Sequence, residues 1–593
     1  MHSATWRGLG LAVFGSVLGG CHDHIDLDPL DDRAPIEARS RPAPIIGGTM
    51  VLIGELAVAA DPDRDRVHLV DLGQGVAREG ITLTAGDQPG RVVAGGSGLA
   101  HVVLRGAGAI ATLDLAQGKV LRRVPVCADP RGLAYDAEAA SLHVACADGT
   151  VVELAEDDGA ELDRELFEPD LRDVVLVDGR RHLSRFRDAS LQAPEGARIG
   201  PAGDFDASDR QSHVAWRTWA LPDGTIAMLH QRQSANAIDL VSHDAGGDEA
   251  DGGGEGDGPS YGGGGGGFSC GAGLSVAALS FFDVRSDPPV LLSSEDLGNA
   301  RLTVDVATNA DHSRWALAMP GAKEGEPTVM VLDTGERPCL LDDAPKQPLL
   351  AAGQITSVAF LDADTLIMQS REPAQLAVLD AGVLSIIPLP GESAYDTGHE
   401  IFHRATDSQL SCASCHPEGT DDGHVWSFVQ LGPRRTQSLD IDLASSAPYH
   451  WSGDMRDLDM IMGEVLAHRM GGMRQSPERR DSFAQWLFAQ RHAPADNGAD
   501  PRELVDAGKA AFSRYACDSC HTGPELGGSR SDRFRGELLQ VPSLHRVALR
   551  PPYMHDARAL TLEDAVRDML DGTGHADAPQ DDVGALAAFL RTR

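Results

Sequence analysis

A strand-and-turn unit that returns about every 40 residues is the feature that most constrains how this chain can fold. The runs RVHLVDLGQG, AIATLDLAQG and TVVELAEDDG each join an apolar, β-branched stretch to a polar turn. Their equivalent residues Val67, Ile110 and Val151 lie 43 and 41 residues apart, and TVMVLDTG and QLAVLDAG repeat the pattern later. Such a period predicts an all-β propeller of about seven blades over residues 48–391. A pair of β-sandwiches is the alternative that the same strands allow.

The length and charge of the chain limit its organisation and its partners. A chain of 593 residues is too long for one core, so several domains are expected. Acidic residues number 89 against 51 basic ones, a formal net charge of −38, which argues against nucleic acid as a partner. A Gly-rich acidic segment at 243–273 cannot bury a core and is expected to be a surface loop of the propeller.

The N-terminus has the features of an export signal. Arg7 precedes an apolar run, Leu9 to Gly20, that is too short to span a bilayer. The run ends in LGGC, which resembles a bacterial lipobox, so residues 1–20 are predicted to be a lipoprotein signal peptide and Cys21 the lipidated residue. An ordinary signal peptide is the alternative. Residues 21–47 are acidic and Pro-rich and predict a tether. We therefore expect an exported protein on the periplasmic side of a bacterial membrane, with the lipid as its only membrane contact.

The pattern changes from strands to helices after residue 391. Asp500 and Pro501 form a helix start, and the helical pattern that follows leads into ACDSCH. An equivalent lead-in from Tyr395 precedes SCASCH. The sequence thus predicts two α-helical cytochrome c domains, 392–495 and 500–593, that share the plan helix, C-x-x-C-H, loop, helix.

The two C-x-x-C-H motifs carry the chemistry of covalent haem attachment. Two thiols add to the two vinyl groups of haem, and the adjacent imidazole binds the iron. Thiol–disulfide exchange and zinc binding are the alternatives for a C-x-x-C pair, but the following His, the repetition and the export signal favour two haem c groups. The predicted attachment and ligand residues are Cys412, Cys415, His416, Cys517, Cys520 and His521.

Four further cysteines are available for disulfides in an oxidising compartment. Cys127, Cys146, Cys270 and Cys339 allow three pairings, and the sequence does not choose among them. Cys127 with Cys146 is the most local pairing, and four buried thiols are the alternative.

Motifs that recur in order across both helical halves carry a family resemblance. The first half contains RRTQSL and YHWSGDMRDL, and the second contains GPELGG and VPSLHRVALRPPYMHDARALTLEDAV. With the two C-x-x-C-H motifs, residues 395–593 resemble the bacterial dihaem cytochrome c peroxidase/MauG family. The strand region resembles YVTN-type β-propellers, although their signature letters are absent.

The resemblance implies two unequal haems. The C-terminal one would transfer electrons, with His521 and Met569 as iron ligands and Met554 as the rival of Met569. The N-terminal one, held by His416, would react with peroxide. Trp451 occupies the place of the tryptophan that lies between the haems in the family.

Several family positions are changed in this sequence. The distal His falls at Ser427, and His424 lies nearby as a substitute; otherwise the iron would be open. The catalytic Glu is absent from AHRMG, where His468 could serve as the acid–base group and Arg469 could stabilise a leaving oxygen anion. Glu464, one turn earlier, is a weaker candidate.

The Asn positions that help to hold an inter-haem Ca²⁺ in the family are arginines here, which argues against calcium. Arg434, Arg435 and Arg546 are instead expected to bind haem propionates, because a guanidinium matches a carboxylate.

The expected function is that of an exported dihaem oxidoreductase. It would reduce hydrogen peroxide with electrons from a small redox protein or cytochrome, passed from the C-terminal to the N-terminal haem. Peroxide-driven oxidation of a partner protein, as in MauG, and non-enzymatic electron transfer are the alternatives. The propeller contains no catalytic triad or phosphate loop, and we expect it to be a recognition domain for a protein ligand.

Overall fold

The computed structural model describes residues 30–201, 209–240, 261, 273–286, 288–298, 301–333, 347–490, 498, 500–524 and 526–593. The predicted signal peptide with Cys21, the cysteines Cys270 and Cys339, and the Gly-rich segment apart from Tyr261 and Gly273 lie outside the described residues.

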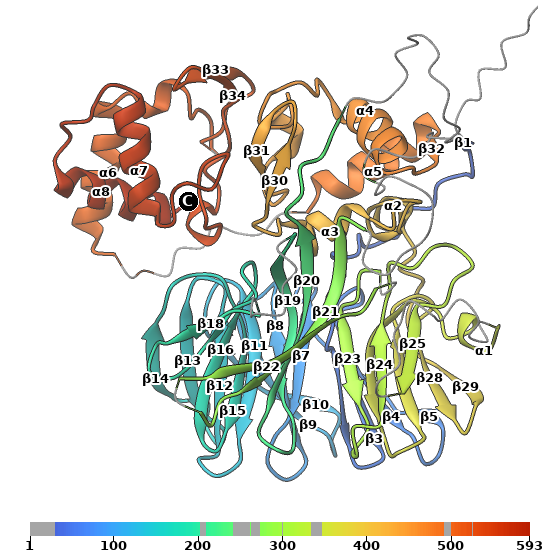
Figure 1. Cartoon of the computed structure of the whole chain (residues 1–593). Coiled ribbons are helices and arrows are strands. Elements are labelled where there is room, and N and C mark those ends of the chain that lie inside the picture. Colours follow the sequence, from blue (N-terminus) through green and yellow to red (C-terminus); the bar gives the residue numbers. More distant parts are fainter. Residues whose placement is uncertain are drawn as a thin grey trace, which may run out of the picture.

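Seven antiparallel sheets follow one another along the described part of the chain and form a seven-bladed propeller, as predicted (Figure 1). Blade 1 consists of β2 (Met50–Ile53), β3 (Leu56–Asp61), β4 (Arg66–Asp71), β5 (Val76–Ala77) and β6 (Ile81–Thr82), and blade 2 consists of β7 (Pro89–Ala94), β8 (Leu99–Leu104), β9 (Ala109–Asp114) and β10 (Lys119–Pro125). Blade 3 consists of β11 (Pro130–Asp136), β12 (Ser141–Cys146), β13 (Thr150–Ala155) and β14 (Glu161–Leu166), and blade 4 consists of β15 (Leu171–Val177), β16 (Arg180–Arg185), β17 (Leu191–Gln192) and β18 (Arg198–Ile199). Blade 5 consists of β19 (Arg210–Ala220), β20 (Ile226–Ser234), β21 (Ser275–Asp283) and β22 (Val290–Asp296). Blade 6 consists of β23 (Asp305–Thr308), β24 (Arg314–Ala318) and β25 (Val329–Asp333), and blade 7 consists of β26 (Ile355–Phe360), β27 (Leu366–Ser370), β28 (Gln375–Asp380) and β29 (Val383–Pro388).

The first strand of each blade lies next to the first strand of the following blade, around the propeller axis. Burial therefore falls outward within a blade: β12 is buried throughout, whereas the outermost strand β14 is mostly exposed. Each blade consists of consecutive strands, so the first and last blades share no strand. The ring of blades therefore closes through side chains, where β2 of blade 1 lies next to β26 of blade 7. Thr49 Oγ1 lies 2.9 Å from Gln369 Oε1, and Arg371 Nε lies 2.6 Å from Asp63 Oδ2.

Two helical domains lie at one end of the propeller (Figure 1). The first contains α2 (Thr397–His403), α3 (Cys412–Cys415), the 3-10 turns η2 (Pro417–Gly419) and η3 (Leu443–Ser445), the hairpin β30 (Val425–Phe428) and β31 (Gly432–Arg435), α4 (Leu458–Met460), the π-helix η4 (Ile461–Arg469) and α5 (Pro477–Phe488). The second contains α6 (Arg502–Arg514), η5 (Cys517–Ser519), the hairpin β33 (Ser531–Phe534) and β34 (Glu537–Gln540), η6 (Val547–Leu549), α7 (Leu562–Gly572) and α8 (Gln580–Arg591). The short helix α1 (Gln347–Leu350) belongs to the propeller.

Both domains pack the helix before the C-x-x-C-H motif against their last helix. A glycine makes each contact possible: Gly398 of α2 touches Trp486 of α5, and Gly508 of α6 touches Ala585 of α8. An aromatic residue four positions later, Phe402 or Phe512, lies on the same helix and enters the same core.

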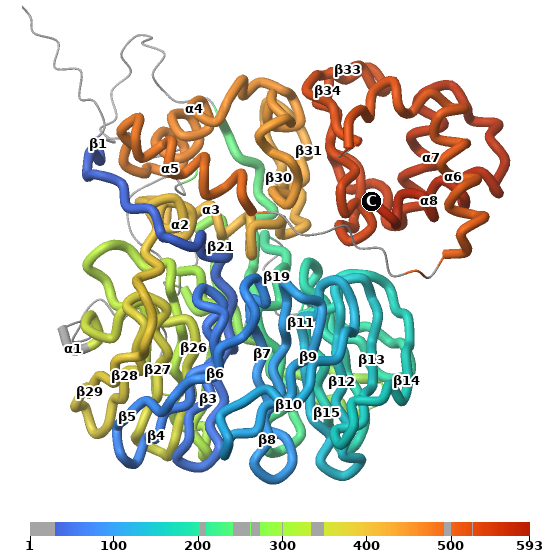
Figure 2. The backbone as a smooth tube through the Cα atoms, turned by 180° about the vertical axis from the view of Figure 1, so that it is seen from behind, coloured from blue at the N-terminus to red at the C-terminus, as the bar shows by residue number. Residues whose placement is uncertain are grey.

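The segment before the propeller is packed against the first helical domain, which corrects the expectation of a tether reaching to residue 47. Strand β1 (Leu30–Asp31) pairs in parallel with β32 (Arg474–Gln475). The chain then runs along that domain to blade 1, as Figure 2 shows from behind, and the carbonyl of Pro42 accepts a hydrogen bond from Trp486 Nε1 at 2.9 Å. None of the helices in the described ranges has both the length and the apolar character that are needed to cross a bilayer.

Candidate cofactor site

A cavity of about 770 Å³ extends across the two helical domains and is lined by both C-x-x-C-H motifs. The six residues of the motifs that line it are Cys412, Cys415, His416, Cys517, Cys520 and His521. Most other lining side chains are apolar and come from both domains, which is the environment that a largely apolar cofactor with a few polar contacts requires.

The two motif histidines are oriented in the same way. His416 Nδ1 lies 3.2 Å from the carbonyl oxygen of Thr420, and His521 Nδ1 lies 3.0 Å from that of Leu526. Burial lowers the pKa of both imidazoles, so they are neutral at pH 7. An Nδ1–H that donates to a carbonyl leaves Nε2 as the unprotonated nitrogen, which is the atom that binds a metal.

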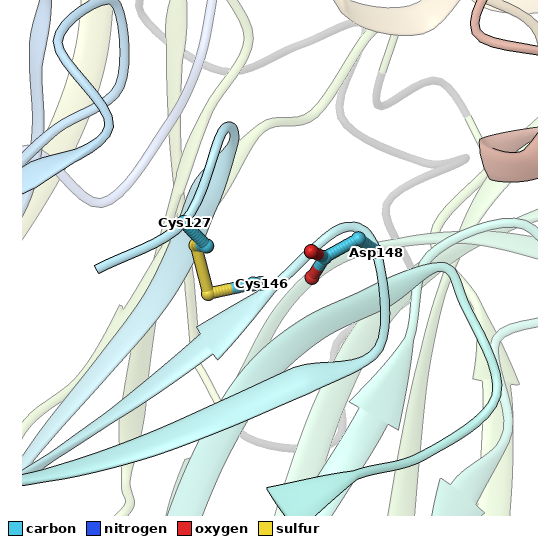
Figure 3. Close-up of side chains that lie close together, drawn as sticks. All are labelled: Cys127, Cys146 and Asp148. Atoms are coloured by element: carbon cyan, nitrogen blue, oxygen red, sulfur yellow. A yellow bond between two sulfur atoms is a disulfide. The ribbon is translucent and has the colours of Figure 1, made fainter. Parts of the chain in front are cut away.

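The four motif cysteines are free thiols, unlike Cys127 and Cys146 of the propeller. Burial raises the pKa of Cys412 to about 12 and that of Cys517 to about 11, so both thiols stay protonated at neutral pH. Cys127 and Cys146 form a disulfide, which is the most local of the pairings that the sequence left open. Figure 3 shows Asp148 beside this disulfide, but both sulfur atoms are bonded to each other and are not available to a metal.

Three arginines that line the cavity have buried Nε–H groups without a hydrogen-bond partner among the described residues. They are Arg434, Arg435 and Arg550. A buried unpaired donor is costly and indicates a missing acceptor, and the carboxylates of haem propionates would supply one. The donor set, the free thiols and the oriented histidines together fit haem c.

Arg550 was not singled out in the sequence, whereas Arg546 was. Burial lowers the pKa of Arg550 to about 10, and its Nη2 donates to the backbone carbonyl of Ser543 at 3.1 Å. Arg546 instead pairs with Asp440 of the first helical domain at 2.8 Å and with Asp129 of the propeller at 3.2 Å. This corrects the expectation for Arg546, since a guanidinium already held by two carboxylates has little capacity for a propionate. The sequence offered no signal that distinguished the two arginines.

Trp451 lies where the two helical domains meet. Its Nε1–H donates to the carbonyl of Arg435 at 2.7 Å, and its own carbonyl accepts from Gln540 N of the second domain at 2.8 Å. Its ring lies 6.1 Å from the ring of His555, centroid to centroid. Trp451 lines the cavity, as do both predicted thioether residues, Met569 and Met554.

The two helical domains repeat each other closely from Tyr449 and Tyr553 onward. The backbone N–H groups of these tyrosines close equivalent turns, to Met455 O and Ala559 O, both at 2.7 Å. The residues after them, His450 and Met554, both have a positive φ, 63° and 72°. Each position and its counterpart are separated by 104 residues.

The same spacing continues into the helix that follows each turn. Asp457 caps the first helix and Thr561 caps its counterpart, each accepting a hydrogen bond from the backbone three residues later. Three pairs of cavity-lining residues share this spacing: Leu458 with Leu562, Ile461 with Ala565, and Val465 with Met569. The first domain therefore presents an isopropyl group where the second presents a thioether.

The helix η4 presents only some of the predicted catalytic residues to the cavity. Val465 and Arg469, four residues apart, share the face that lines it, and Met470 N donates to Val465 O in a π-turn. His468 and Glu464 lie on another face, are exposed to solvent and do not line the cavity. This corrects the expectation that His468 is the acid–base group.

His424 is buried against the propeller and does not line the cavity, which corrects its expected role as a distal group. Its Nδ1 lies 2.9 Å from His213 Nε2 of blade 5, and its Nε2 lies 3.0 Å from the carbonyl of Ser234. Both ring nitrogens are therefore occupied. The Asp422 carboxyl two residues earlier is also buried, and burial raises its pKa to about 7.

Tyr261 and His450 are further polar residues of the cavity that were missed in the sequence. Tyr261, between β20 and β21 of the propeller, donates its backbone N–H to Arg469 O at 2.9 Å, and its side chain lies beside the Arg469 guanidinium. Burial raises the pKa of the Tyr261 phenol, which stays protonated. His450 is the other, with Nδ1 3.3 Å from Asp454 Oδ1. The sequence signals that could have indicated these two residues are the position of Tyr261, an aromatic residue in a Gly-rich run, and the position of His450 next to Trp451.

Comparisons with known proteins agree with this site. No family model matches the chain. Its C-terminal part is similar to cytochrome c551 peroxidase of Nitrosomonas europaea, with 24% identity over 252 residues that cover 31% of this chain and 73% of the peroxidase.

Solved structures are similar to part of the chain at low TM-scores. Hydrazine synthase of Kuenenia stuttgartiensis has a TM-score of 0.39 and 11% identity, covering 61% of this chain and 99% of that one. Hsv2 of Kluyveromyces lactis has a TM-score of 0.32 and 9% identity, covering 58% and 96%. These likenesses carry no functional conclusion. Fold and site together define a seven-bladed propeller followed by cytochrome c peroxidase-like helical domains that are suited to haem c.

Proposed function

We propose that this protein is an exported dihaem peroxidase that reduces hydrogen peroxide with electrons from a small redox protein or cytochrome. The observation that carries the proposal is Val465. A valine cannot bind iron, so the helix position that offers Met569 in the second domain offers no ligand in the first. One haem would then be closed by His521 and Met569, and the haem held by His416 would keep a side for peroxide.

Haem groups in the two motifs would supply iron that exchanges electrons and that, in the first domain, reacts with peroxide. The reaction consumes two electrons and two protons for each hydrogen peroxide and yields two water molecules. Arg469 and Tyr261 are two adjacent polar donors in the first half of the cavity. The Arg469 guanidinium would stabilise negative charge on the departing oxygen, and the neutral Tyr261 hydroxyl would donate a hydrogen bond to it.

The proposed path between the two motifs contains Trp451, since this residue lies at the junction of the domains: its ring is hydrogen-bonded to the first domain and its backbone carbonyl to the second. A thioether ligand from Met569 raises the reduction potential of its iron, which suits a site that stores an electron. Arg434, Arg435 and Arg550 would hold the propionates.

His450 is the cavity residue that would weaken this proposal. Asp454 orients its Nδ1, so Nε2 is free for a metal. If His450 ligates the first iron, peroxide must displace it, and the protein would be closer to an electron carrier.

Oxidation of a partner protein is the second candidate function. Arg469 is a poor acid–base group, because a guanidinium does not lose its proton in proteins. An oxidising state would be long-lived if its reduction by an external donor were slow, and a partner protein could then supply the electrons. The expected location of either activity is the periplasmic side of a membrane, with lipid on Cys21.

Stopped-flow peroxide turnover tests the proposal. The haem-loaded mature protein, partly reduced with ascorbate, is mixed with hydrogen peroxide and a reduced cytochrome. Catalytic oxidation of the cytochrome is the expected result. An oxidised state that persists without turnover would favour the second candidate, and no reaction with peroxide would leave an electron-transfer protein.

A further inference from the structure

The loop that carries His416 is buried against the propeller. Residues 417–422 of this loop all have less than a tenth of their surface exposed, and they include three acidic residues, Glu418, Asp421 and Asp422, of which Glu418 and Asp421 pair with arginines. Buried carboxylates are retained in proteins only where they are paired. Their partners come from the propeller.

Glu418 is held by two arginines of different blades, Arg105 of blade 2 and Arg172 of blade 4. Its Oε1 accepts from Arg172 Nη1 of β15 at 2.6 Å, and its Oε2 accepts from Arg105 Nη2 at 2.7 Å. Arg172 also donates to the carbonyl of Trp216 at 3.0 Å, which fixes the guanidinium within the propeller.

Asp421 is held by Arg187 in a two-pronged pair, with Nε–Oδ1 at 2.9 Å and Nη2–Oδ2 at 3.1 Å. Arg187 also donates to Asp170 of the propeller at 2.6 Å and to the carbonyl of Leu549 at 2.7 Å. One guanidinium thus joins the propeller to both helical domains. A lysine could not form this fork, because its ammonium is a single point of charge.

Between these two anchors lies Thr420, whose carbonyl is the acceptor for His416 Nδ1. Glu418 and Asp421 fix the chain on either side of that carbonyl, so they fix the direction of the imidazole. Asp421 also accepts from Arg435 at 2.7 Å, and the Arg435 carbonyl holds Trp451. The same anchor therefore connects the His416 loop to the tryptophan at the domain junction.

We propose that the propeller is a structural part of the first haem site, with Arg172 and Arg187 as positioning residues that hold the axial His416 through Glu418 and Asp421. The propeller end that carries these arginines is covered by the helical domains of its own chain, so a partner protein does not bind there. The inference rests on the proposed haem attachment to Cys412 and Cys415.

The test uses the full-length, haem-loaded protein and the variants Arg172→Gln and Arg187→Gln. The readouts are the electron paramagnetic resonance g-values of the ferric first haem and the reduction potentials of both haems. We expect altered g-values for the first haem, because its imidazole is no longer fixed. We also expect a lower potential of the first haem, because the loop carboxylates lose their neutralising charge. The second haem should keep its potential.

Arg217→Gln is the matched control, since Arg217 pairs with Asp305 of β23 and does not contact the loop. It should leave the first haem unchanged even if it lowers the unfolding temperature. Arg187→Lys keeps the positive charge but cannot form the two-pronged pair with Asp421, and it replaces Arg187→Gln in the test if that variant does not fold. We expect Arg187→Lys to alter the g-values of the first haem and to keep its reduction potential closer to that of the wild type.

Unchanged g-values and potentials in both glutamine variants, or equal changes in Arg217→Gln, would overturn the inference. A pyridine haemochrome assay, which measures the number of haems per chain, distinguishes failure of this inference from failure of the proposed dihaem function. One haem per chain, attached only to the second motif, would overturn the dihaem function itself.

Discussion

At the scale of single residues, the polar groups of the first half of the cavity decide what can bind there. Arg469 is part of the helical domain, but Tyr261 is supplied by the propeller, and the two side chains lie together in a mostly apolar cavity. In such surroundings a hydrogen bond to an anion is strong, because water does not compete for it.

Fluoride binding to the ferric first haem tests the role of Tyr261, since fluoride is a small anion that accepts hydrogen bonds. Tyr261→Phe should weaken fluoride binding about tenfold, as expected for the loss of one hydrogen bond to a charged group. Spectrophotometric titration measures the affinity.

Tyr449→Phe is the control for this substitution, because Tyr449 lines the same cavity but donates its hydroxyl to the Leu443 carbonyl at 2.9 Å. Its affinity for fluoride should stay within about twofold of wild type. Equal affinities of both variants would exclude Tyr261 as a donor, and a wild-type protein that binds no fluoride would exclude an open iron.

Substitution of the two methionines identifies the ligand in the second domain. Met569→Leu should lower the potential of the second haem and abolish the absorption of the iron–thioether bond, because a leucine cannot ligate. Met554→Leu should leave both unchanged. The reverse result would assign the ligand to Met554, and redox titration with optical spectra distinguishes the two outcomes.

At the scale of the elements, the second helical domain depends on the close contact between α6 and α8. A Cβ on Gly508 would lie 1.9 Å from the carbonyl oxygen of Ala585, so any side chain forces the helices apart. The contact also has a structural counterpart in the first domain, between Gly398 and Trp486.

Gly508→Ala should destabilise the second domain by roughly 1–3 kcal/mol, the usual cost of overpacking a core. Thermal unfolding, followed by the absorbance of the second haem, measures the effect. Gly584→Ala in α8 is the matched control: its Cβ meets no atom within 4 Å, so the change should stabilise the helix by up to about 1 kcal/mol. Similar unfolding temperatures for both variants would contradict the packing argument.

At the scale of the whole molecule, two adjacent carboxyl groups at the interface between the propeller and the first helical domain have opposite electrostatic surroundings. Arg187 and Arg435 hold the pKa of Asp421 well below its usual range despite burial. Burial raises the pKa of Asp422 to about 7, and the N–H of His424 and the Gln233 amide are among its hydrogen-bond donors.

The two groups therefore contribute to stability in opposite pH ranges. The contribution of Asp421 is present above its unfolded pKa, near 3.8, and is lost as the pH falls below it. The contribution of Asp422 is complete below pH 3.8 and is lost as the pH rises through about 7.

Asn substitutions test this difference. Asp421→Asn should lower the unfolding temperature at pH 8, because it leaves Arg187 without its partner. Asp422→Asn should raise the unfolding temperature at pH 8 and raise it less at pH 5, because the amide is neutral throughout and the cost of the carboxyl grows between pH 3.8 and about 7. Calorimetry at both pH values gives the comparison, and a destabilised Asp422→Asn protein at pH 8 would show that the carboxylate is the native form.

The sequence by itself determined the features that depend on local pattern. The 40-residue period requires each unit to stack on its neighbours, which leads to a propeller, and the C-x-x-C-H spacing places two thiols and an imidazole on one turn. The repeat unit and the C-x-x-C-H motif each extend over a few tens of residues at most, so both can be recognised from the order of residues along the chain alone.

Only the tertiary structure decided which side chains converge on the cavity. His468 lies next to Arg469 in the sequence, but the two residues face different sides of the helix, one toward solvent and the other toward the cavity. His424 faces the propeller, Arg550 rather than Arg546 lines the cavity, and Tyr261 enters it from another domain. His424 and Tyr261 are placed by contacts with His213 and Arg469, each about 200 residues away in the chain. Local sequence pattern contains no record of such contacts, because they are set by the packing of whole domains on one another.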